Sequence, residues 1–182
     1  MISATKGSGL PPLSAEDRQR VHERIDADFG DEFYLLARLA MALTSTSSAM
    51  VALDTGGRYR ALHQDFSEPA RGMGRYPDDP LCDRLLSARE SFLTGDAGAD
   101  PGLRSTWEVR RLGVHSLAAI PLRRPQGETL GVLLLMDCAL HRFNATDVRV
   151  LERMAAVCID RVEARLAGSA QAPDPAPDPA PD

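Results

Sequence analysis

The sequence predicts a three-layer α/β sandwich, in which a central sheet is covered by helices on both faces. The main observation is the segment from Gly113 to Asp137, where two apolar runs flank a short polar turn. Both alternating faces of each run are largely apolar, whereas a strand with one face in water would alternate apolar with polar residues. A second observation is that patterns typical of helices precede and follow these runs. We therefore expect two central strands, with the long terminal helices on one face of the sheet and short middle segments on the other.

Alternation assigns the side chains of the two runs to opposite faces. In the first run, one face carries Val114, Ser116, Ala118, Ile120 and Leu122. The other face carries His115, Leu117, Ala119 and Pro121. In the second run, Gly131, Leu133 and Leu135 oppose Val132, Leu134 and Met136. Each face of the predicted sheet therefore has enough apolar surface to be buried.

Long helices are expected at both ends of the fold. Ser14 with Asp17 resembles a capping box that opens a helix over residues 14–30, which Gly30 interrupts. A second helix over residues 32–44 has a broad apolar face that consists of Phe33, Leu36, Leu39, Ala40 and Leu43. The last helix covers residues 144–167, and its apolar residues are spaced as in a coiled-coil seam: Val148, Leu151, Ala155, Cys158 and Val162.

Shorter elements are expected in the middle of the chain. The runs 48–54 and 58–64 are joined by Thr-Gly-Gly, which predicts a β-hairpin because glycine readily adopts a positive φ. Residues 79–90 predict a short helix with Leu81, Leu85 and Leu86 facing inward, and residues 91–94 predict a short strand. Residues 103–113 predict another short helix that ends at Gly113.

Composition and the chain ends narrow the classes of function. The 182 residues suit one domain, and the formal net charge of -5 disfavours nucleic-acid binding, which needs a basic face. No apolar run is long enough for a membrane span, and the first residues lack the apolar core of a signal peptide. We therefore expect a cytoplasmic protein, with disorder in residues 1–13 and in the Pro/Asp-rich tail over residues 168–182.

The second half of the chain resembles the GAF domain family. That family shows a G-x-x-S-x-x-x-x-P-L strand, a polar turn with glycine, an L-G-V-L strand, and F-x-x-x-D before the last helix. The matching residues here are Gly113, Ser116, Pro121, Leu122, Gly127, Leu130, Gly131, Phe143 and Asp147. Upstream, the helix over 32–44, the hairpin over 48–64 and the Asp100-Pro101 pair also match in order. The resemblance covers residues 32–167.

The resemblance implies an α+β fold over residues 31–167, with a central antiparallel sheet of five or six strands and helices on both faces. GAF domains generally act as sensory or regulatory modules. The family implies a small-molecule pocket between the sheet and the middle helices. It also implies dimerisation through the first and last helices, which fits the predicted seam from Leu151 to Val162.

The cysteines are the first candidates for chemistry. Cys82, Cys138 and Cys158 form no CxxC pair, which favours reduced thiols over a disulfide framework or a metal site. Cys82 is followed by Asp83, not by the histidine found beside bilin-attaching cysteines in some photoreceptor relatives. Free methionine-(R)-sulfoxide reductases of this fold use clustered cysteines, but their G-V-C-G segment has no counterpart here. Cys82 therefore stands as a pocket or redox candidate beside the alternative that it is a small buried residue, which we favour more strongly for Cys158.

Five further residues are candidates for ligand contacts. Asp96 either binds a ligand amine or closes an Asx-turn. Trp107 either stacks on a flat ligand or packs in the core, and His115 is either a ligand or switch residue or a hydrogen-bonded histidine at the mouth of its strand. Arg104 and Arg110 are candidates for binding an anionic group, although adjacent Arg110 and Arg111 cannot both face a pocket from a helix.

We therefore expect a GAF-like sensory module without catalytic activity of its own and without a metal site. The sequence identifies no cofactor. An unidentified small-molecule effector is expected between the sheet and residues 66–112. The terminal helices are expected to form a homodimer and to signal to a partner protein. The alternatives are a redox enzyme similar to free methionine-(R)-sulfoxide reductase and a ligand-free structural dimerisation domain.

Overall fold

The computed structural model describes Ser14, residues 30–54, residues 59–65, Leu81, Arg84 and residues 90–169. Residues 15–29 of the helix predicted over 14–30, the Thr-Gly-Gly turn and most of the helix predicted over 79–90 lie outside these described residues. Both predicted disordered ends also lie outside them, apart from residues 168 and 169.

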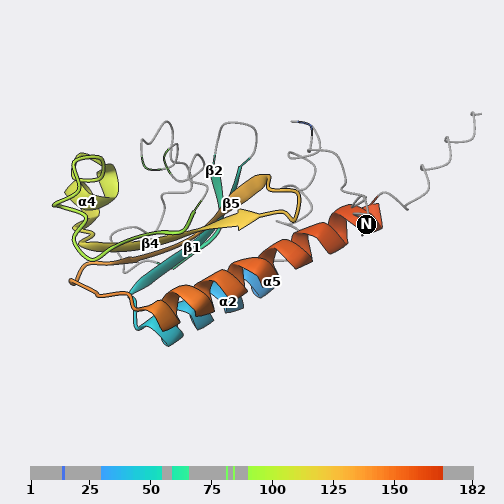
Figure 1. Cartoon of the computed structure of the whole chain (residues 1–182), viewed down its shortest axis with the longest axis horizontal. Coiled ribbons are helices and arrows are strands. Elements are labelled where there is room, and N and C mark those ends of the chain that lie inside the picture. The colour runs from blue at the N-terminus through green and yellow to red at the C-terminus, as the bar shows by residue number, and fades with distance from the viewer. Residues whose placement is uncertain are drawn as a thin grey trace, which may run out of the picture.

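The described helices and strands follow one another along the chain in a single order. The elements are α2 (Gly30–Thr44), β1 (Ser48–Asp54), β2 (Tyr59–Asp65), β3 (Phe92–Thr94), α4 (Trp107–Leu112), β4 (Ser116–Arg123), β5 (Thr129–Asp137) and α5 (Ala145–Ser169). The strands form one antiparallel sheet in the order β2-β1-β5-β4-β3. The predicted antiparallel α+β architecture is confirmed, with β4 and β5 in the interior of the sheet (Figure 1).

One face of the sheet is covered by α2 and α5, which lie side by side beneath it (Figure 1). We call this the helix face. Its buried core includes Val51, Ala118, Ile120, Leu133 and Leu135, which pack with Phe33 of α2 and Leu151 of α5. Both long helices therefore pack on one face of the sheet, as predicted.

The opposite face is covered by α4 and by the loop before it, and we call it the loop face (Figure 1). Leu117, Ala119, Val132, Leu134 and Met136 pack there. They contact three buried residues from the covering segments: Leu81, Ala97 and Leu103. Adjacent residues of β4 and β5 thus serve different cores, as predicted.

Two residues at the start of the first apolar run were assigned wrongly. Strand β4 begins only at Ser116, so the alternation does not extend back to Val114 and His115. Val114 packs in the loop-face core, and the His115 side chain is exposed. The His115 backbone continues the sheet irregularly, because its carbonyl accepts from Ala97 N at 2.6 Å and its N–H donates to Asp137 O at 2.8 Å.

The apolar face predicted for α2 is partly wrong. Phe33, Ala37 and Ala40 are buried, but Leu39 and Leu43 are 49% and 54% exposed. The small alanines let the helix lie close to the sheet, and this turns the leucines away from it. Leu35, Leu39 and Leu43 follow one another at intervals of four residues, so they form an exposed apolar stripe on α2.

The apolar residues of the seam predicted on α5 do form one buried stripe, but this stripe packs against the same chain and not against a second copy. Leu151, Ala155, Cys158 and Val162 are all buried in the helix-face core, against the sheet and α2. Spacing by three and four identifies a buried stripe without saying what covers it. These residues are therefore core residues of one chain and are not available as a surface between two chains.

Local signals in the sequence fix the ends of these elements. Asn144 Oδ1 accepts from Thr146 N at 2.7 Å, and Asp147 Oδ2 accepts from Asn144 N at 2.8 Å, a reciprocal cap that starts α5. Gly113 ends α4 with a φ of 69°, in the left-handed region. At Gly131 a side chain would collide with the Ala52 carbonyl of β1, so β1 and β5 approach closely only because this residue is glycine.

Candidate functional site

The loop face has buried polar groups at the start of α4. Thr106 is the residue before the helix and is 2% exposed, and Glu108 in the first turn is 3% exposed. Thr106 Oγ1 forms no hydrogen bond with any described residue, and it does not cap the helix. A buried hydroxyl without a hydrogen-bond partner among the described residues is costly, so Thr106 marks this position as a candidate ligand contact, with the buried carboxyl group of Glu108 two residues farther along the chain.

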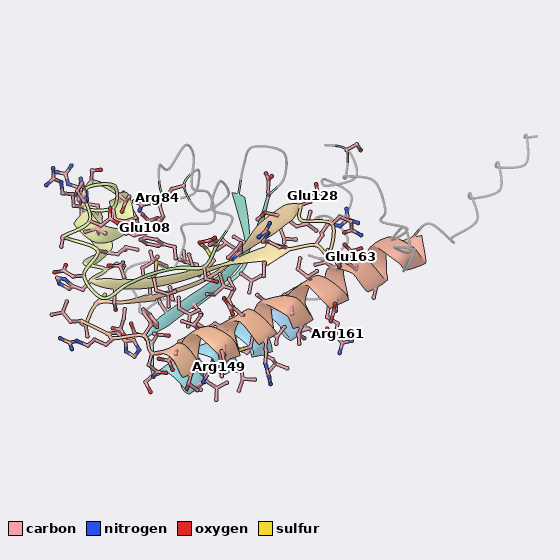
Figure 2. The ribbon with its side chains drawn as sticks, viewed as in Figure 1. Arg84, Glu108, Glu128, Arg149, Arg161 and Glu163 are labelled. Carbon is pink, nitrogen blue, oxygen red and sulfur yellow. The ribbon has the colours of Figure 1, made fainter. Side chains whose placement is uncertain are left out.

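The loop before α4 is held by an ion pair with the middle of the chain. Arg84 donates from Nη1 and Nη2 to the Asp100 carboxylate at 3.1 and 3.2 Å. The Arg84 guanidinium also lies 4.7 Å from the centre of the Phe92 ring. The hydrogen bonds from Arg84, followed by that from Gly102 N, hold the pKa of Asp100 below its ordinary value. Arg84 and Glu108 lie at the same end of the molecule, over α4 (Figure 2).

The structure leaves most of the described residues that were predicted for the ligand site exposed to solvent. Arg104, Arg110 and His115 are exposed, and Trp107 is half-buried. Asp96 is also exposed, and its Oδ1 accepts from Ala99 N at 3.2 Å, which is the Asx-turn alternative. Cys82 lies outside the described residues. Trp107 is thus the predicted residue that lies nearest in sequence to the buried polar pair.

Sequence reasoning missed Thr106 and Glu108. The signal was present in the spacing of α4, because Glu108 precedes Leu112 by four residues and so shares a helix face with an apolar residue. A charged residue on the inward face of a short helix is a reasonable site candidate.

A second polar arrangement connects the β4–β5 turn to α5. The Arg124 side chain is 1% exposed and follows the end of β4. It donates from Nε and Nη2 to the carboxylate of Glu163 on α5, with Nη2 to Oε2 at 3.2 Å, and from Nη1 to Glu128 Oε2 at 3.0 Å. The Glu163 and Glu128 carboxylates raise the pKa of Arg124 against the opposing effect of burial. In Figure 2, Glu128 and Glu163 project toward the same region between the turn and the helix.

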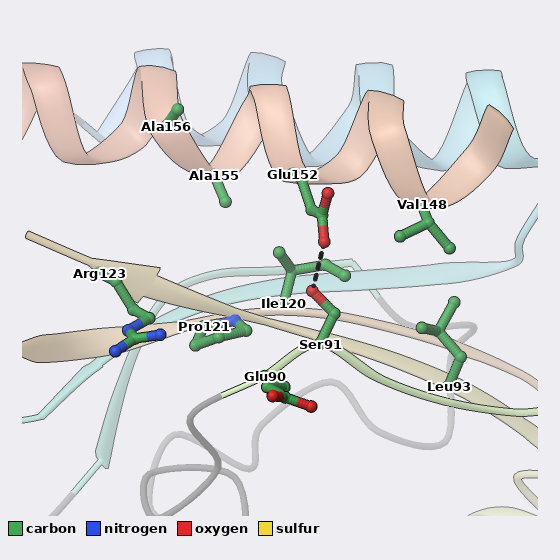
Figure 3. Close-up of a pocket in the computed structure, with 10 residues that line it drawn as sticks. All are labelled: Glu90, Ser91, Leu93, Ile120, Pro121, Arg123, Val148, Glu152, Ala155 and Ala156. Atoms are coloured by element: carbon green, nitrogen blue, oxygen red, sulfur yellow. Dashed lines mark hydrogen bonds between the residues drawn. The ribbon is translucent and has the colours of Figure 1, made fainter. Parts of the chain in front are cut away.

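The helix face contains a cavity of about 590 Å³ at the edge of the sheet. It lies between α5 and the adjoining parts of β3 and β4, and its lining is shown in Figure 3. The family resemblance placed the pocket on the opposite face, between the sheet and the middle segments. This cavity is therefore separate from the site marked by Thr106 and Glu108.

A family model for the GAF domain matches residues 27–159. The match covers most of the 182 residues and nearly all of the described fold. The chain belongs to the GAF domain family. The family membership that the sequence resemblance predicted is confirmed.

Solved structures with similar folds come from several classes of protein. One is a domain of a putative two-component sensor histidine kinase from Sinorhizobium meliloti 1021, with a TM-score of 0.63, 13% identity, and coverage of 79% of this chain and 97% of that one. The photoproduct state of GAF3 from Slr1393 of Synechocystis sp. PCC6803 has a TM-score of 0.62 and 16% identity, with 78% and 98% covered. Type II free methionine-R-sulfoxide reductase from Thermoplasma acidophilum has a TM-score of 0.59 and 13% identity, with 81% and 95% covered. At these identities the similarity establishes the fold. No functionally curated protein matches the sequence.

The described cysteines of this GAF domain have different environments. Cys158 is buried in the helix-face core, as expected, and burial raises the pKa of its thiol to about 12. Cys138 is exposed, and its Sγ lies 3.4 Å from the carbonyl oxygen of Leu112. Cys158 is a poor nucleophile, because its raised pKa leaves little of the thiolate, which is the reactive form.

The described part of the GAF domain brings together no group of three or more potential metal ligands, and none of its helices is long and apolar enough to cross a membrane.

Proposed function

We propose that this GAF domain is a sensory module that binds a small-molecule effector on the loop face and signals through its terminal helices to a partner protein. The observation that carries the proposal is the burial of Glu108 and Thr106 beneath the short helix α4. The Thr106 hydroxyl has no hydrogen-bond partner among the described residues, and an effector with a hydrogen-bonding group would provide one. Among the described residues, this face is covered by turns, by Leu81 and by a six-residue helix, and such short segments deform more easily than long packed helices.

The proposed route of the signal begins in β4 and β5, which contribute side chains to both faces. A change of packing at Leu117 or Leu134 on the loop face would shift the strands themselves. Arg124 joins the turn between these strands to Glu163 near the end of α5. Movement of the hairpin would therefore reach the last helix through a bidentate ion pair.

The proposed homodimer uses a surface different from the predicted seam. The apolar stripe of Leu35, Leu39 and Leu43 is exposed on α2, and Val157 is exposed on the neighbouring α5. Exposed apolar residues that gather on one surface are typical of interaction sites. We expect Leu39→Glu to leave the fold intact and to convert a dimer into a monomer in analytical ultracentrifugation. Leu151→Glu should instead unfold the chain. A Leu39→Glu variant that remains dimeric would exclude this surface.

The decisive experiment for the sensory function is native mass spectrometry of freshly purified protein, combined with its visible absorption spectrum. A copurified mass or colour would identify the effector, and Glu108→Gln should reduce its occupancy. Arg110→Gln, a charge change at an exposed residue of the same helix, is the matched control. Absence of a ligand across expression hosts and ligand screens would favour a structural dimerisation domain.

The proposal includes no catalytic step by the chain itself. The redox alternative predicts loss of free methionine sulfoxide coupled to NADPH through thioredoxin, and Cys82→Ser or Cys138→Ser should abolish it. Turnover that the Cys158→Ala control retains and that Cys82→Ser or Cys138→Ser abolishes would establish an enzyme. It would also overturn the assignment as a purely sensory module.

A further inference from the structure

The Thr106 hydroxyl is a buried polar group that has no partner in the described part of the chain. Thr106 is 2% exposed and directly precedes α4, where a threonine commonly caps the helix by accepting from a backbone N–H. Here the side chain makes no capping hydrogen bond, and Thr106 Oγ1 has no hydrogen-bond partner among the described residues. Such a hydroxyl lowers the stability of the folded chain, because it loses its hydrogen bonds with water and gains none in return.

Three other buried hydroxyls show that this is an exception within the described fold. Thr44 and Thr46 share a hydrogen bond of 3.0 Å between their Oγ1 atoms. Ser116 Oγ donates to a backbone carbonyl at 2.8 Å. All four residues are buried to a similar degree. Thr106 therefore differs from the others in its lack of a partner and not in its burial.

The neighbours of Thr106 belong to the loop-face core. Its backbone N–H donates to the carbonyl of Leu103 at 2.8 Å, and Leu103 is fully buried in that core. Val109 and Leu112 of α4 pack against the same core. On the sheet side, the side chains of this core are apolar: Met50, Ala52, Leu117, Ala119, Val132, Leu134 and Met136. A ligand that reaches the Thr106 hydroxyl from the core would therefore meet one hydrogen-bonding group and a large apolar surface.

A charged ligand would be unfavourable in these surroundings. A charge that leaves water for an apolar core loses its hydration, which costs far more than the same transfer of a neutral hydroxyl or amide. The arginines nearest in sequence, Arg104 and Arg110, are exposed, so their charges remain in water. Glu108 is buried in the first turn of α4, and its carboxyl group would further oppose an anion.

We propose that the effector of the loop face is an uncharged, mainly apolar molecule whose hydrogen-bonding group pairs with Thr106 Oγ1. This inference rests on the proposed sensory function and adds the chemical class of the effector. The apolar part of the effector lies against the loop-face core, where Leu117 and Leu134 belong to the two central strands. A hydroxyl can donate one hydrogen bond and accept two, so an alcohol, a phenol or an amide meets this requirement.

Thr106→Val tests whether the hydroxyl serves the fold. Valine has nearly the same shape and removes the unpaired hydroxyl, so we expect the melting temperature of the ligand-free chain to rise by about 2–4 °C. Thr44→Val is the matched control, because Thr44 is 4% exposed and its hydroxyl donates to the Ala40 carbonyl at 2.8 Å. This control should lower the melting temperature, since a paired buried hydroxyl is lost. Circular dichroism measures both changes.

Binding is tested by NMR titration of the full chain with four probes built on one aromatic ring: benzyl alcohol, toluene, benzoate and benzylammonium. We expect methyl shifts at Leu103, Val109 and Leu117. Benzyl alcohol should bind about tenfold more tightly than toluene, because its hydroxyl pairs with Thr106. Benzoate and benzylammonium should bind more weakly than toluene. In Thr106→Val, benzyl alcohol should lose its advantage and bind no more tightly than toluene.

Several outcomes would overturn the proposal. A lower melting temperature for Thr106→Val would show that the hydroxyl is bound within the folded chain. Equal binding of benzyl alcohol and toluene by the wild type, or an unchanged advantage of benzyl alcohol in Thr106→Val, would exclude the contact with Thr106. Tighter binding of benzoate or benzylammonium at the loop face would refute the chemical class and leave the sensory function in place. Absence of loop-face shifts with every probe, together with no copurified ligand, would instead reject the sensory function and this inference with it.

Discussion

The two faces of the sheet are built from the same strands and covered in different ways. The helix face is closed by α2 and the 25 residues of α5, whose buried side chains are apolar. Among the described residues, the loop face is covered by turns, by the six residues of α4 and by Leu81, an Arg84–Asp100 ion pair holds the loop before α4, and the carboxyl group of Glu108 is buried there. The comparison indicates that one face provides the rigidity of the domain and that the other can change its packing at lower cost.

The largest expected loss of stability comes from replacing two neighbouring leucines of β5, one on each face of the sheet. Leu133 is fully buried on the helix face and Leu134 is 1% exposed on the loop face. Replacement of either by alanine should cost about 2–5 kcal/mol in free energy of unfolding. We expect Leu133→Ala near the upper end and Leu134→Ala near the lower end, because loops collapse into a cavity more readily than paired helices. Urea denaturation measures both, and a larger loss for Leu134→Ala would contradict the contrast.

Arg124→Met should give the next largest effect. The variant leaves Glu163 and Glu128 without their shared cation, although both carboxylates retain some contact with solvent. We expect a loss of about 1–3 kcal/mol. Hydrogen exchange should increase near Glu163, at the end of α5, and remain unchanged near Leu151. Arg123→Met, at the adjacent exposed arginine, is the control, and equal exchange in both variants would contradict a link between the hairpin and α5.

The pH dependence of the helix face should reveal the burial of Cys158. Burial raises the folded pKa from the ordinary value of 9.0 to about 12, so the neutral thiol stabilises the folded state below pH 9. This contribution should decline as the pH rises from 9 toward 12, by about 1.4 kcal/mol for each pH unit. The difference in stability between the wild type and Cys158→Ala isolates it. An identical alkaline decline in the two proteins would exclude it.

The smallest effect is expected from the ion pair of the loop face. The pKa of Asp100 is lowered by Arg84 first and by Gly102 N second, so its contribution to stability is present above pH 3.8 and is lost as the pH falls further. NMR titration of the Asp100 carboxyl should give a value below 3.8, and Arg84→Met should move it upward. No movement in the variant would show that Arg84 is not the cause.

The sequence predicted the parts of the fold that depend on short-range pattern. Alternation in β4 and β5 placed Leu117 and Ile120 on opposite faces, as the structure shows, and the Asn144 region gave the start of α5. The pattern could not show what covers a stripe, so Leu151 was assigned to a second chain and Leu39 to the core. Both assignments depend on how closely α2 approaches the sheet, which is a property of the packed molecule.

The candidate sites were harder to predict for the same reason. The burial of Glu108 depends on contacts between segments distant in sequence, and residue type alone favours exposure of a glutamate. The cavity beside Ser91 depends on where β3 stops relative to β4, which is a difference in strand length that no motif records. His115 was misplaced because the strand begins one residue after it.

The length of α5 has a mechanical consequence. The helix has 25 residues, so it is about 37 Å long at about 1.5 Å per residue. Val162 is its last buried apolar residue among the side chains that the structure describes, and the helix continues to Ser169 (Figure 1). A rigid rod held in this way is a lever, and a tilt of about five degrees at its base would move its far end by roughly 3 Å. Small adjustments of packing under the helix would therefore be amplified where the chain leaves the domain.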